Sequence, residues 1–251
     1  MTEHRYAVLL ATRGRPWNVE RLHAAIQDTA ERPDLVDLWC YVDDDDPEGI
    51  EKYRATEVPA VWATGPRMRL ARTWNHIAQL VMDLGKPYTH LLAWGDDVVP
   101  ETPGWDRLFA EAGARTGPGF YYGRDGIWDY REWPDHPEHL VLPTATAITV
   151  DAYRALGYVS PPGLVHLCID LCWRDVAMAA GALHYLPEIM IRHYHRIAGA
   201  PDDQTYRDAN DDIAQKNTDS LAHSSWRMSP RFDRDAEKLR GAVDAWRRAR
   251  V

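Results

Sequence analysis

Two adjacent carboxylates, Asp96 and Asp97, follow the apolar run from Leu91 to Trp94 and a single glycine. A short apolar run that ends in turn residues is typical of a buried strand. In open α/β sheets ligands bind at the carboxyl ends of strands. Neighbouring carboxylates repel each other unless a cation or donors neutralise them, and oxygen ligands suit Mg or Mn. The pair therefore predicts a divalent-cation site, with a polar turn as the alternative.

Polar side chains also follow the other apolar runs in residues 1–100. Thr12, Arg13 and Arg15 come after the first run, Asp43 after the second, and Arg69 lies beyond the third. Such groups can bind a base and a ribose by hydrogen bonds, and a diphosphate through guanidinium groups and a metal. The glycine-rich signatures of dinucleotide-binding and P-loop sites do not occur in the sequence. A nucleotide site without a glycine cradle is predicted, with solvated surface arginines as the alternative.

The second half of the chain supplies a carboxylate and two histidines. Asp170 lies at the start of a helix predicted over residues 169–180, where the helix macrodipole stabilises a carboxylate whether or not it has a function. His193 and His195 lie on a late strand, and residues two apart on a strand point to the same face. Both imidazoles are therefore expected at one site, with Arg196 beside them; satisfied surface or core histidines are the alternative.

The elements that must position these groups alternate between strands and helices in the first half. Apolar runs predict strands at 6–11, 35–42 and 60–63. Helical spacing of apolar residues predicts helices at 17–30 and from the break at 64–66 to about residue 84. This alternation is typical of βαβ units and predicts an α/β fold with a mostly parallel central sheet flanked by helices.

Beyond Pro100 the chain becomes richer in proline, glycine and aromatic residues, and a more irregular structure is expected. The pattern predicts a strand at 145–150, a turn at 186–191 entering the late strand, a polar mobile segment at 199–217, and a final helix near 233–248. A cluster of aromatic side chains fits an acceptor-stacking surface and core packing equally well. Its members are Tyr121, Tyr122, Trp128, Tyr130 and Trp133.

The order of these motifs resembles the nucleotide-diphosphosugar half of GT-A fold glycosyltransferases, close to the family 2-like group. The resemblance covers about residues 1–100 and rests on the segments Leu9–Pro16, Tyr41–Asp44, Arg69–Asn75 and Trp94–Asp97. In that family the strand-two Asp and the helix Arg contact the nucleotide, which here implies Asp43 and Arg69. An Asp-x-Asp motif holds the metal there. Because Gly95 stands at its first acidic position, the resemblance implies Asp97 as the metal ligand and leaves Asp96 to the ribose or a metal-bound water.

A weaker resemblance covers the second half. Many such enzymes carry a Glu-Asp pair at the start of a helix, and its Asp is the general base. Here Ile169 replaces the Glu and Asp170 takes the place of the Asp. A late histidine often completes the metal site, which implies His193 or His195.

The function implied by the resemblance is sugar transfer from a nucleoside diphosphate sugar to a hydroxyl of an acceptor glycan or another molecule. It implies a metal-dependent reaction, with Mn or Mg, and inversion of the anomeric configuration. A sugar-phosphate nucleotidylyltransferase is a rival, but it needs a glycine-rich loop after the first strand, and residues 12–16 contain one glycine. A non-catalytic nucleotide-sugar or glycan-binding protein is a second rival, because Gly95 and Ile169 replace expected acids.

Length and composition fit one globular GT-A domain over residues 1–251. Its expected parts are a nucleotide-sugar-binding half (1–100), an acceptor-site and metal-completing half (101–232), and a C-terminal helix (233–251). The formal net charge of -9 disfavours nucleic acid as a partner. No apolar stretch is long enough for a signal peptide or a membrane span, so the cytoplasm is the expected compartment.

The chain has three cysteines, Cys40, Cys168 and Cys172, without a Cys-x-x-Cys pair. They are predicted to be reduced core thiols. A zinc site built from His166, Cys168, Asp170 and Cys172 is a weaker interpretation, because this spacing matches no familiar zinc pattern.

Overall fold

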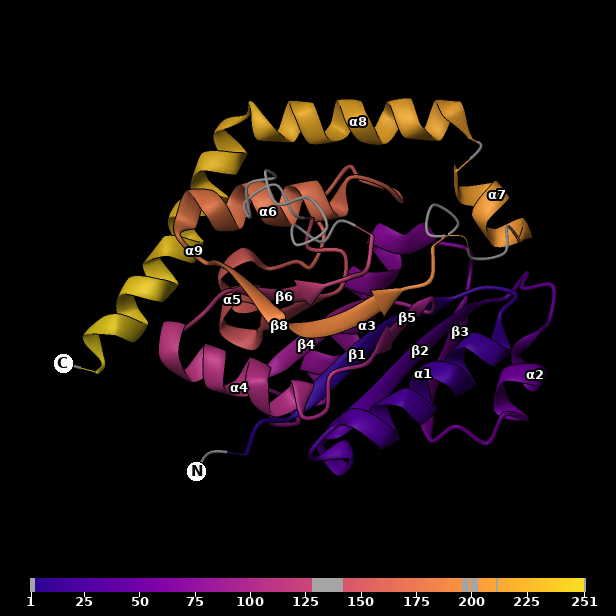
Figure 1. Cartoon of the computed structure of the whole chain (residues 1–251). Helices are drawn as coiled ribbons and strands as arrows, with labels where there is room; N and C mark the ends of the chain where they lie inside the picture. Colours follow the sequence, from indigo (N-terminus) through magenta and orange to yellow (C-terminus); the bar gives the residue numbers. More distant parts are fainter. Residues whose placement is uncertain (1–2, 128–141, 196–198, 200–202, 211, 251) are drawn as a thin grey trace.

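The computed structural model describes residues 3–127, 142–195, 199, 203–210 and 212–250. Within them the strands follow the order β3-β2-β1-β4-β7-β6-β8-β5 (Figure 1). The first four strands pair in parallel, which confirms the predicted βαβ half. They are β1 (Tyr6–Thr12), β2 (Val36–Asp43), β3 (Ala60–Gly65) and β4 (His90–Gly95).

The later strands make the sheet mixed. β7 (Thr146–Thr149) runs antiparallel between β4 and β6 (Phe120–Arg124). β8 (Leu183–His193) pairs in parallel with β6 and antiparallel with β5 (Val98–Pro100). In the last pairing His193 stands opposite Val98, so the register alone brings this histidine beside the acids that precede β5.

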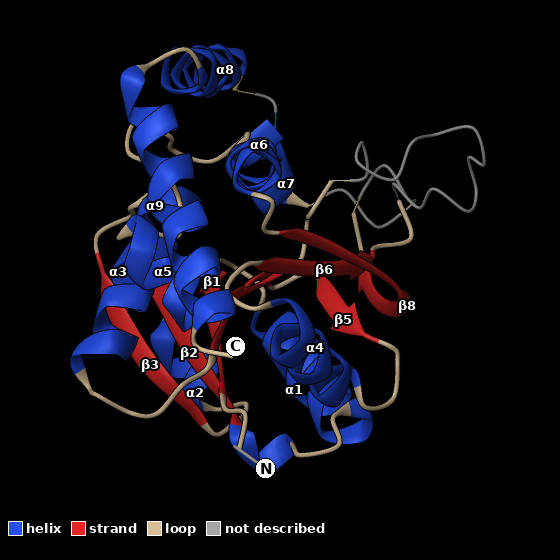
Figure 2. Cartoon of the chain, turned by 90° about the vertical axis from the view of Figure 1, so that its left-hand side faces the viewer, coloured by secondary structure: helices blue, strands red, loops and turns tan. Residues whose placement is uncertain are grey.

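Helices cover both faces of the sheet (Figure 2). Side chains at alternate positions of β1 point to opposite faces, as the strand period requires. Tyr6, Val8 and Leu10 pack with α1 (Pro16–Thr29) and α4 (Trp105–Thr116). Ala7 and Leu9 pack with α3 (Arg69–Asp83) and α5 (Val150–Leu156). The short helix α2 (Ile50–Arg54) and a 3-10 turn at Pro33–Leu35 lie in the connections around β2.

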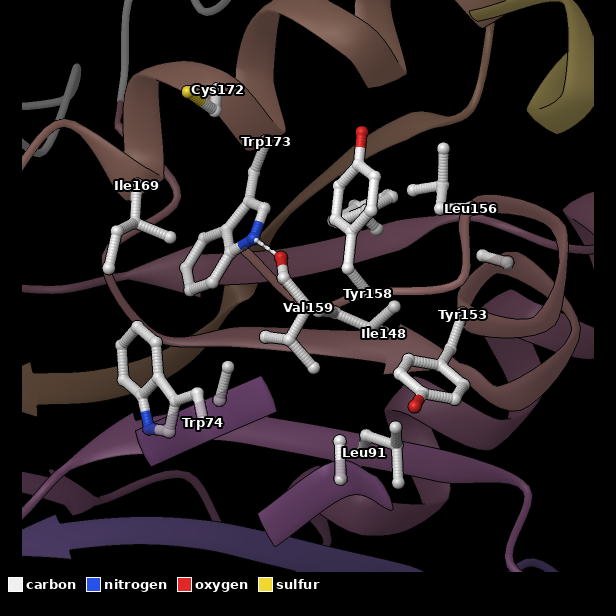
Figure 3. Packing of buried hydrophobic residues seen from close by; sticks show 14 of the residues in the cluster. Trp74, Leu91, Ile148, Tyr153, Leu156, Tyr158, Val159, Ile169, Cys172 and Trp173 are labelled. Carbon is white, nitrogen blue, oxygen red and sulfur yellow. Dashed lines mark hydrogen bonds between the residues drawn. The ribbon is translucent and has the colours of Figure 1, made fainter. Parts of the chain in front are cut away.

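A further helical layer covers the α3 side of the sheet. Figure 1 shows α8 (Ile213–Arg227) running above α6 (Ile169–Ala180), with α9 (Pro230–Arg248) descending beside them. The indoles of Trp74 on α3 and Trp173 on α6 lie 5.4 Å apart between ring centroids (Figure 3). Trp173 Nε1 donates to the Val159 carbonyl oxygen at 2.6 Å, so this aromatic contact joins α6 to the core without leaving its N–H unpaired.

The turn predicted at 186–191 is wrong, because β8 continues through Pro187. The pairing of β8 with β6 shifts register between Tyr122, opposite Tyr185, and Arg124, opposite Met190. Pro187 falls inside this irregular stretch. Proline has no backbone N–H, but at an irregular position no regular hydrogen bond between the strands is lost, as at other strand bulges.

The polar segment predicted to be mobile at 199–217 contains helices in its described part, namely α7 (Gln204–Asn210) and the start of α8. Tyr206 on α7 is only 8% exposed. α7 and the residue before it contact the sheet edge through charged and aromatic side chains, not through a stripe of apolar residues. The hydrophobic pattern of the sequence therefore did not predict this helix. The terminal helix begins at Pro230, before the predicted start, since proline suits a first helical turn.

The aromatic cluster divides between described and undescribed residues. Tyr121 and Tyr122 on β6 are buried in the core, whereas Trp128, Tyr130 and Trp133 lie outside the described residues. All three cysteines are free; Cys40 and Cys172 are buried and Cys168 is partly exposed. Across the described ranges, no helix combines the length and apolar character needed to cross a bilayer.

Candidate nucleotide-sugar site

A cleft of about 440 Å³ opens where β1, β2 and β4 end. The loop before α6, the end of β8 and the start of α7 complete its walls. The structure brings all ten side chains singled out from the sequence to this cleft. They are Thr12, Arg13, Arg15, Asp43, Arg69, Asp96, Asp97, Asp170, His193 and His195. Arg196 lies outside the described residues.

The two adjacent acids have different surroundings. Asp96 is 5% exposed, and its carboxylate accepts hydrogen bonds from Thr12 Oγ1 at 2.7 Å and Arg15 Nη1 at 3.1 Å. Burial raises the pKa of Asp96, and the neighbouring charge of Asp97 adds to this effect against the attraction of Arg15. Both oxygens of Asp96 are thus engaged by protein groups, which makes this acid a link between β1 and β4.

Asp97 faces the histidine delivered by β8. Its Oδ2 lies 3.4 Å from His193 Nε2 and also accepts a hydrogen bond from the Tyr206 hydroxyl. Burial alone would raise the pKa of Asp97, but the charge and hydrogen bond of His193 outweigh it and hold the pKa below its usual range. Burial likewise opposes a charged His193, yet Asp97 raises the pKa of this imidazole. The pair is therefore an ionised carboxylate beside a histidine that readily carries charge.

The second histidine does not join this contact. The His195 ring lies 5.2 Å from the His193 ring and 5.2 Å from the Tyr206 ring, measured between centroids. Among the described residues no three acidic, histidine or cysteine side chains gather closely enough to hold a metal ion by themselves. That finding also leaves the weaker zinc interpretation without a described ligand set.

Two arginines lie beside the acid that ends β2, and a third lines the same cleft. Arg13 Nη1 lies 3.1 Å from Asp43 Oδ2, and Arg67 Nε lies 3.8 Å from the same oxygen. Burial raises the pKa of Asp43 against the attraction of Arg13. Arg69 forms no side-chain hydrogen bond or ion pair with any residue in the described part of the chain. Its guanidinium therefore remains available to an anionic ligand in the cleft.

The backbone at the start of α3 is unusual. Arg69 has a φ of 62°, in the left-handed region that residues with a Cβ rarely adopt. Thr73 Oγ1 donates to the Arg69 carbonyl oxygen at 2.8 Å, and the next turn is tied to another loop by the bond from Ala71 N to the Val165 carbonyl at 3.0 Å. Such strain persists only where the surroundings hold it, and here they present Arg69 to the cleft.

Asp170 lies in the first turn of α6, as predicted, and its side chain lines the cleft. Its carboxylate accepts a hydrogen bond from Leu171 N at 2.9 Å. Burial raises the pKa of Asp170 against this bond and the attraction of Arg174. A carboxylate in such surroundings is a better proton acceptor than an exposed one.

Three residues that contact the cleft arginines were not identified from the sequence, and they belong to α7 and the position before it. Asp203 binds the Arg15 guanidinium through two oxygens, at 2.6 Å from Nε and 2.6 Å from Nη2. The Tyr206 ring lies 4.3 Å from the Arg15 guanidinium carbon, and Thr205 Oγ1 donates to the Arg13 carbonyl oxygen at 2.8 Å. These groups close one side of the cleft. The sequence marked this stretch as a polar, mobile segment, but no signal singled out these individual contacts, since a short polar segment is also typical of a loop.

No protein-family model and no curated protein sequence matches the chain. It is similar in structure to the mannosyltransferase PcManGT from Pyrobaculum calidifontis in complex with GDP-Man and Mn2+. That match has a TM-score of 0.63 and 10% sequence identity, and covers 99% of this chain and 75% of that chain.

It is also similar to residues 1-349 of TarS from S. aureus in complex with UDP. This match has a TM-score of 0.58 and 11% identity, and covers 98% of this chain and 92% of that chain. The complex of the same TarS fragment with UDP-GlcNAc matches with a TM-score of 0.54 and 8% identity. The chain therefore shares the fold of these structures, which confirms the predicted α/β fold of GT-A type.

Proposed function

We propose that the protein is a glycosyltransferase that moves a sugar from a nucleoside diphosphate sugar to a hydroxyl of an acceptor glycan or another acceptor. The observation that carries this proposal is the presence in one cleft of the available Arg69, the Asp97–His193 pair and the half-buried Asp170. The complexes of the similar structures support it, since PcManGT is in complex with GDP-Man and Mn2+ and TarS with UDP or UDP-GlcNAc.

Asp97 and His193 fit a divalent cation, Mn or Mg. They offer a carboxylate oxygen and an imidazole nitrogen 3.4 Å apart. No third acid, histidine or cysteine in the described part of the chain completes a metal set, which suits a cation that takes other ligands from substrate phosphates. When bound, such a cation would help to neutralise the charge on the departing diphosphate. In this proposal His195 is the alternative histidine ligand of the cation.

The nucleotide-binding groups divide into two kinds in this proposal. Asp43 and Arg69 contact the nucleotide directly, with Arg13 at the rim beside Asp43. Thr12, Arg15 and Asp96 support the site, because Thr12 and Arg15 already donate to the Asp96 carboxylate and all three residues are at most 5% exposed. In this proposal Asp96 also fixes the ends of β1 and β4, and its contact with the ribose or a metal-bound water stays a prediction.

Asp170 is the general base in this proposal. Its carboxylate takes the proton from the acceptor hydroxyl as that oxygen attacks the anomeric carbon and the diphosphate leaves. Arg69 stabilises the negative charge on the leaving group by direct hydrogen bonds. A base opposite the leaving group gives inversion at the anomeric carbon.

Thermal unfolding with UDP or GDP, in Mn and in chelator, tests the donor half of the proposal. A nucleotide that binds the folded state raises the unfolding temperature, and the cation should enlarge this rise. Asp97→Ala should abolish the effect of Mn and keep a cooperative transition. Glu101→Ala is the matched control. Asp97 lies just before β5 and Glu101 just after it, but Glu101 pairs with Arg192 and does not line the cleft. Equal nucleotide affinity in Mn and in chelator would contradict the assignment.

Turnover separates an enzyme from a binding protein. Metal-dependent release of UDP or GDP from a screened nucleotide sugar is expected, because water can replace a missing acceptor. Tight binding of nucleotide sugars without any release, in the presence of screened acceptors, would favour the non-catalytic alternative.

A further inference from the structure

A buried carboxylate on α8 binds the loop that precedes α6. Asp219 is 0% exposed. Its Oδ1 accepts a hydrogen bond from Val165 N at 2.7 Å, and its Oδ2 accepts bonds from His166 N at 3.1 Å and Leu167 N at 2.8 Å. Three successive backbone N–H groups therefore converge on one acid, an arrangement that proteins use to hold anions. Without these donors, a carboxylate buried in this place would be strongly destabilising.

The loop held by Asp219 forms part of the cleft wall. His166, Leu167 and Cys168 all line the cleft. α8 itself lies on the outer side of α6 (Figure 1), and Asp219 does not line the cleft. In the described part of the chain, the hydrogen bonds of this carboxylate to the cleft wall all go to the backbone of residues 165–167.

The same loop connects the two helices that carry the proposed chemistry. On one side the Val165 carbonyl accepts a bond from Ala71 N at 3.0 Å, two residues after Arg69. On the other side Cys168, with a φ of 63°, is the N-cap residue of α6 and lies two residues before Asp170. Movement of the loop would change the separation between the guanidinium for the diphosphate and the proton acceptor.

We propose that Asp219 is a positioning residue that fixes Arg69 and Asp170 relative to each other through the loop 165–167. This inference rests on the proposed function, because it assigns the two positioned groups to donor and acceptor. Asp219 touches neither substrate. Its loss changes catalysis by displacing groups that remain chemically intact.

The test compares Asp219→Asn with Asp235→Asn. Asp235 is a matched control, because it is 2% exposed and accepts a hydrogen bond from the Tyr158 hydroxyl at 2.6 Å. Neither Asp235 nor Tyr158 lines the cleft. Hydrogen exchange of a peptide covering residues 165–167 reports on the loop directly. It should become about tenfold faster or more in Asp219→Asn, since bonds to a charged acceptor are among the stronger ones, and stay unchanged in Asp235→Asn.

Kinetics then decide whether the loop serves the site. With Mn and UDP-GlcNAc or GDP-mannose, kcat of Asp219→Asn should fall about 10- to 100-fold, the size of effect expected from a small misplacement of reacting groups. The donor KM should stay within about threefold, because the groups that bind it are all present. A purely structural role would lower thermal stability in both variants and leave kcat per folded molecule unchanged.

The outcomes are distinct. Unchanged exchange at 165–167 overturns the inference, and so does faster exchange with a parental kcat. If Asp219→Asn does not fold, Asp219→Glu keeps the charge one methylene away; a parental kcat in that variant also overturns the inference. If the wild-type protein binds neither UDP nor GDP with Mn and releases neither from the two donors, the proposed function fails and this inference fails with it.

Discussion

The adjacent carboxylates Asp96 and Asp97 have different roles, because they contact different side chains. Thr12 and Arg15 bind both oxygens of Asp96, whereas Asp97 points to His193 and Tyr206. Gly95 fits this arrangement, because a Cβ at this position would come 2.5 Å from Asp97 Oδ1. An acid in place of Gly95 would displace the Asp97 carboxylate. Glycine at position 95, where the usual motif has an acid, therefore leaves room for the observed orientation of the Asp97 side chain.

Replacing Asp170 separates chemistry from binding. If Asp170 is the base, Asp170→Asn should lower turnover about a hundredfold to ten-thousandfold. Nucleotide affinity should be nearly unchanged, because the groups that bind the nucleotide belong to other elements. Steady-state rates and thermal shifts with UDP or GDP check the two parts. Asp175→Asn is the control on the same helix, since Asp175 pairs with Arg174 and His223 and does not line the cleft.

The same carboxylate sets a pH dependence. Burial raises the pKa of Asp170, and a general base must be ionised to accept a proton. The rate should therefore fall as the pH drops through this raised pKa, at a higher pH than for an ordinary exposed carboxyl group. The pH profile of kcat checks this limb. If the residual kcat of Asp170→Asn falls at low pH in the same way, the group that titrates is not Asp170.

At the scale of elements, α7 is held against the cleft by charge. Asp203 pairs with Arg15 and also accepts a hydrogen bond from Tyr206 N at 2.9 Å at the start of the helix. Burial raises the pKa of Asp203, but Arg15 outweighs it and the pKa is lowered. The helix therefore depends on an ion pair with a residue of the donor half, which links its order to whatever occupies the cleft.

Asp203→Asn isolates the ion pair from the helix cap. Asparagine caps helices as well as aspartate does, so the variant loses the charge attraction and keeps the bond to Tyr206 N. Because the Asp203 side chain is 37% exposed, the pair is worth at most about 1 kcal/mol. Hydrogen exchange of residues 204–208 should accelerate by up to about fivefold. Asp212→Asn, at the cap of α8, is the control and should leave this exchange unchanged. Equal exchange in both variants would argue against the ion pair.

At the scale of the whole molecule, one buried and one half-buried histidine make stability sensitive to acid. The His90 ring stacks on Tyr6 at 5.0 Å, and the His184 ring stacks on Tyr121 at 4.7 Å, measured between centroids. Burial lowers the pKa of His90 to about 3. Burial, with Arg115 and Arg247, lowers that of His184 to about 4. Both imidazoles are neutral in the folded protein at pH values where an unfolded chain binds protons.

The free energy of unfolding should therefore fall as the pH decreases below about 6.5, the pKa of an unfolded histidine. Each such histidine contributes a slope of about 1.4 kcal/mol per pH unit until its folded pKa is reached. Urea titrations at pH 7, 6 and 5 measure this slope, and His90→Gln should make it shallower even if the variant is less stable at every pH. The same slope in both proteins would show that His90 is not the group responsible.

The sequence by itself determined the first half of the fold and the location of most candidate site residues. Apolar strands separated by amphipathic helices lead to parallel pairing, and parallel strands end at one edge of the sheet. Thr12, Asp43 and Asp97 could therefore be assigned to one cleft before any contact was known. The period of a strand also put His193 on the same face as His195, although it did not say which of them meets Asp97.

Only the tertiary structure decided how these groups are paired and held. The register of β8 against β5 selects His193, and Arg15 reaches both Asp96 and Asp203 from segments far apart in the chain. Asp219 binds backbone groups more than fifty residues away, with no motif to mark it. The local hydrophobic pattern of a sequence indicates which side chains lie outside the core. It carries no information about which polar groups from different elements meet, because that depends on how the elements pack.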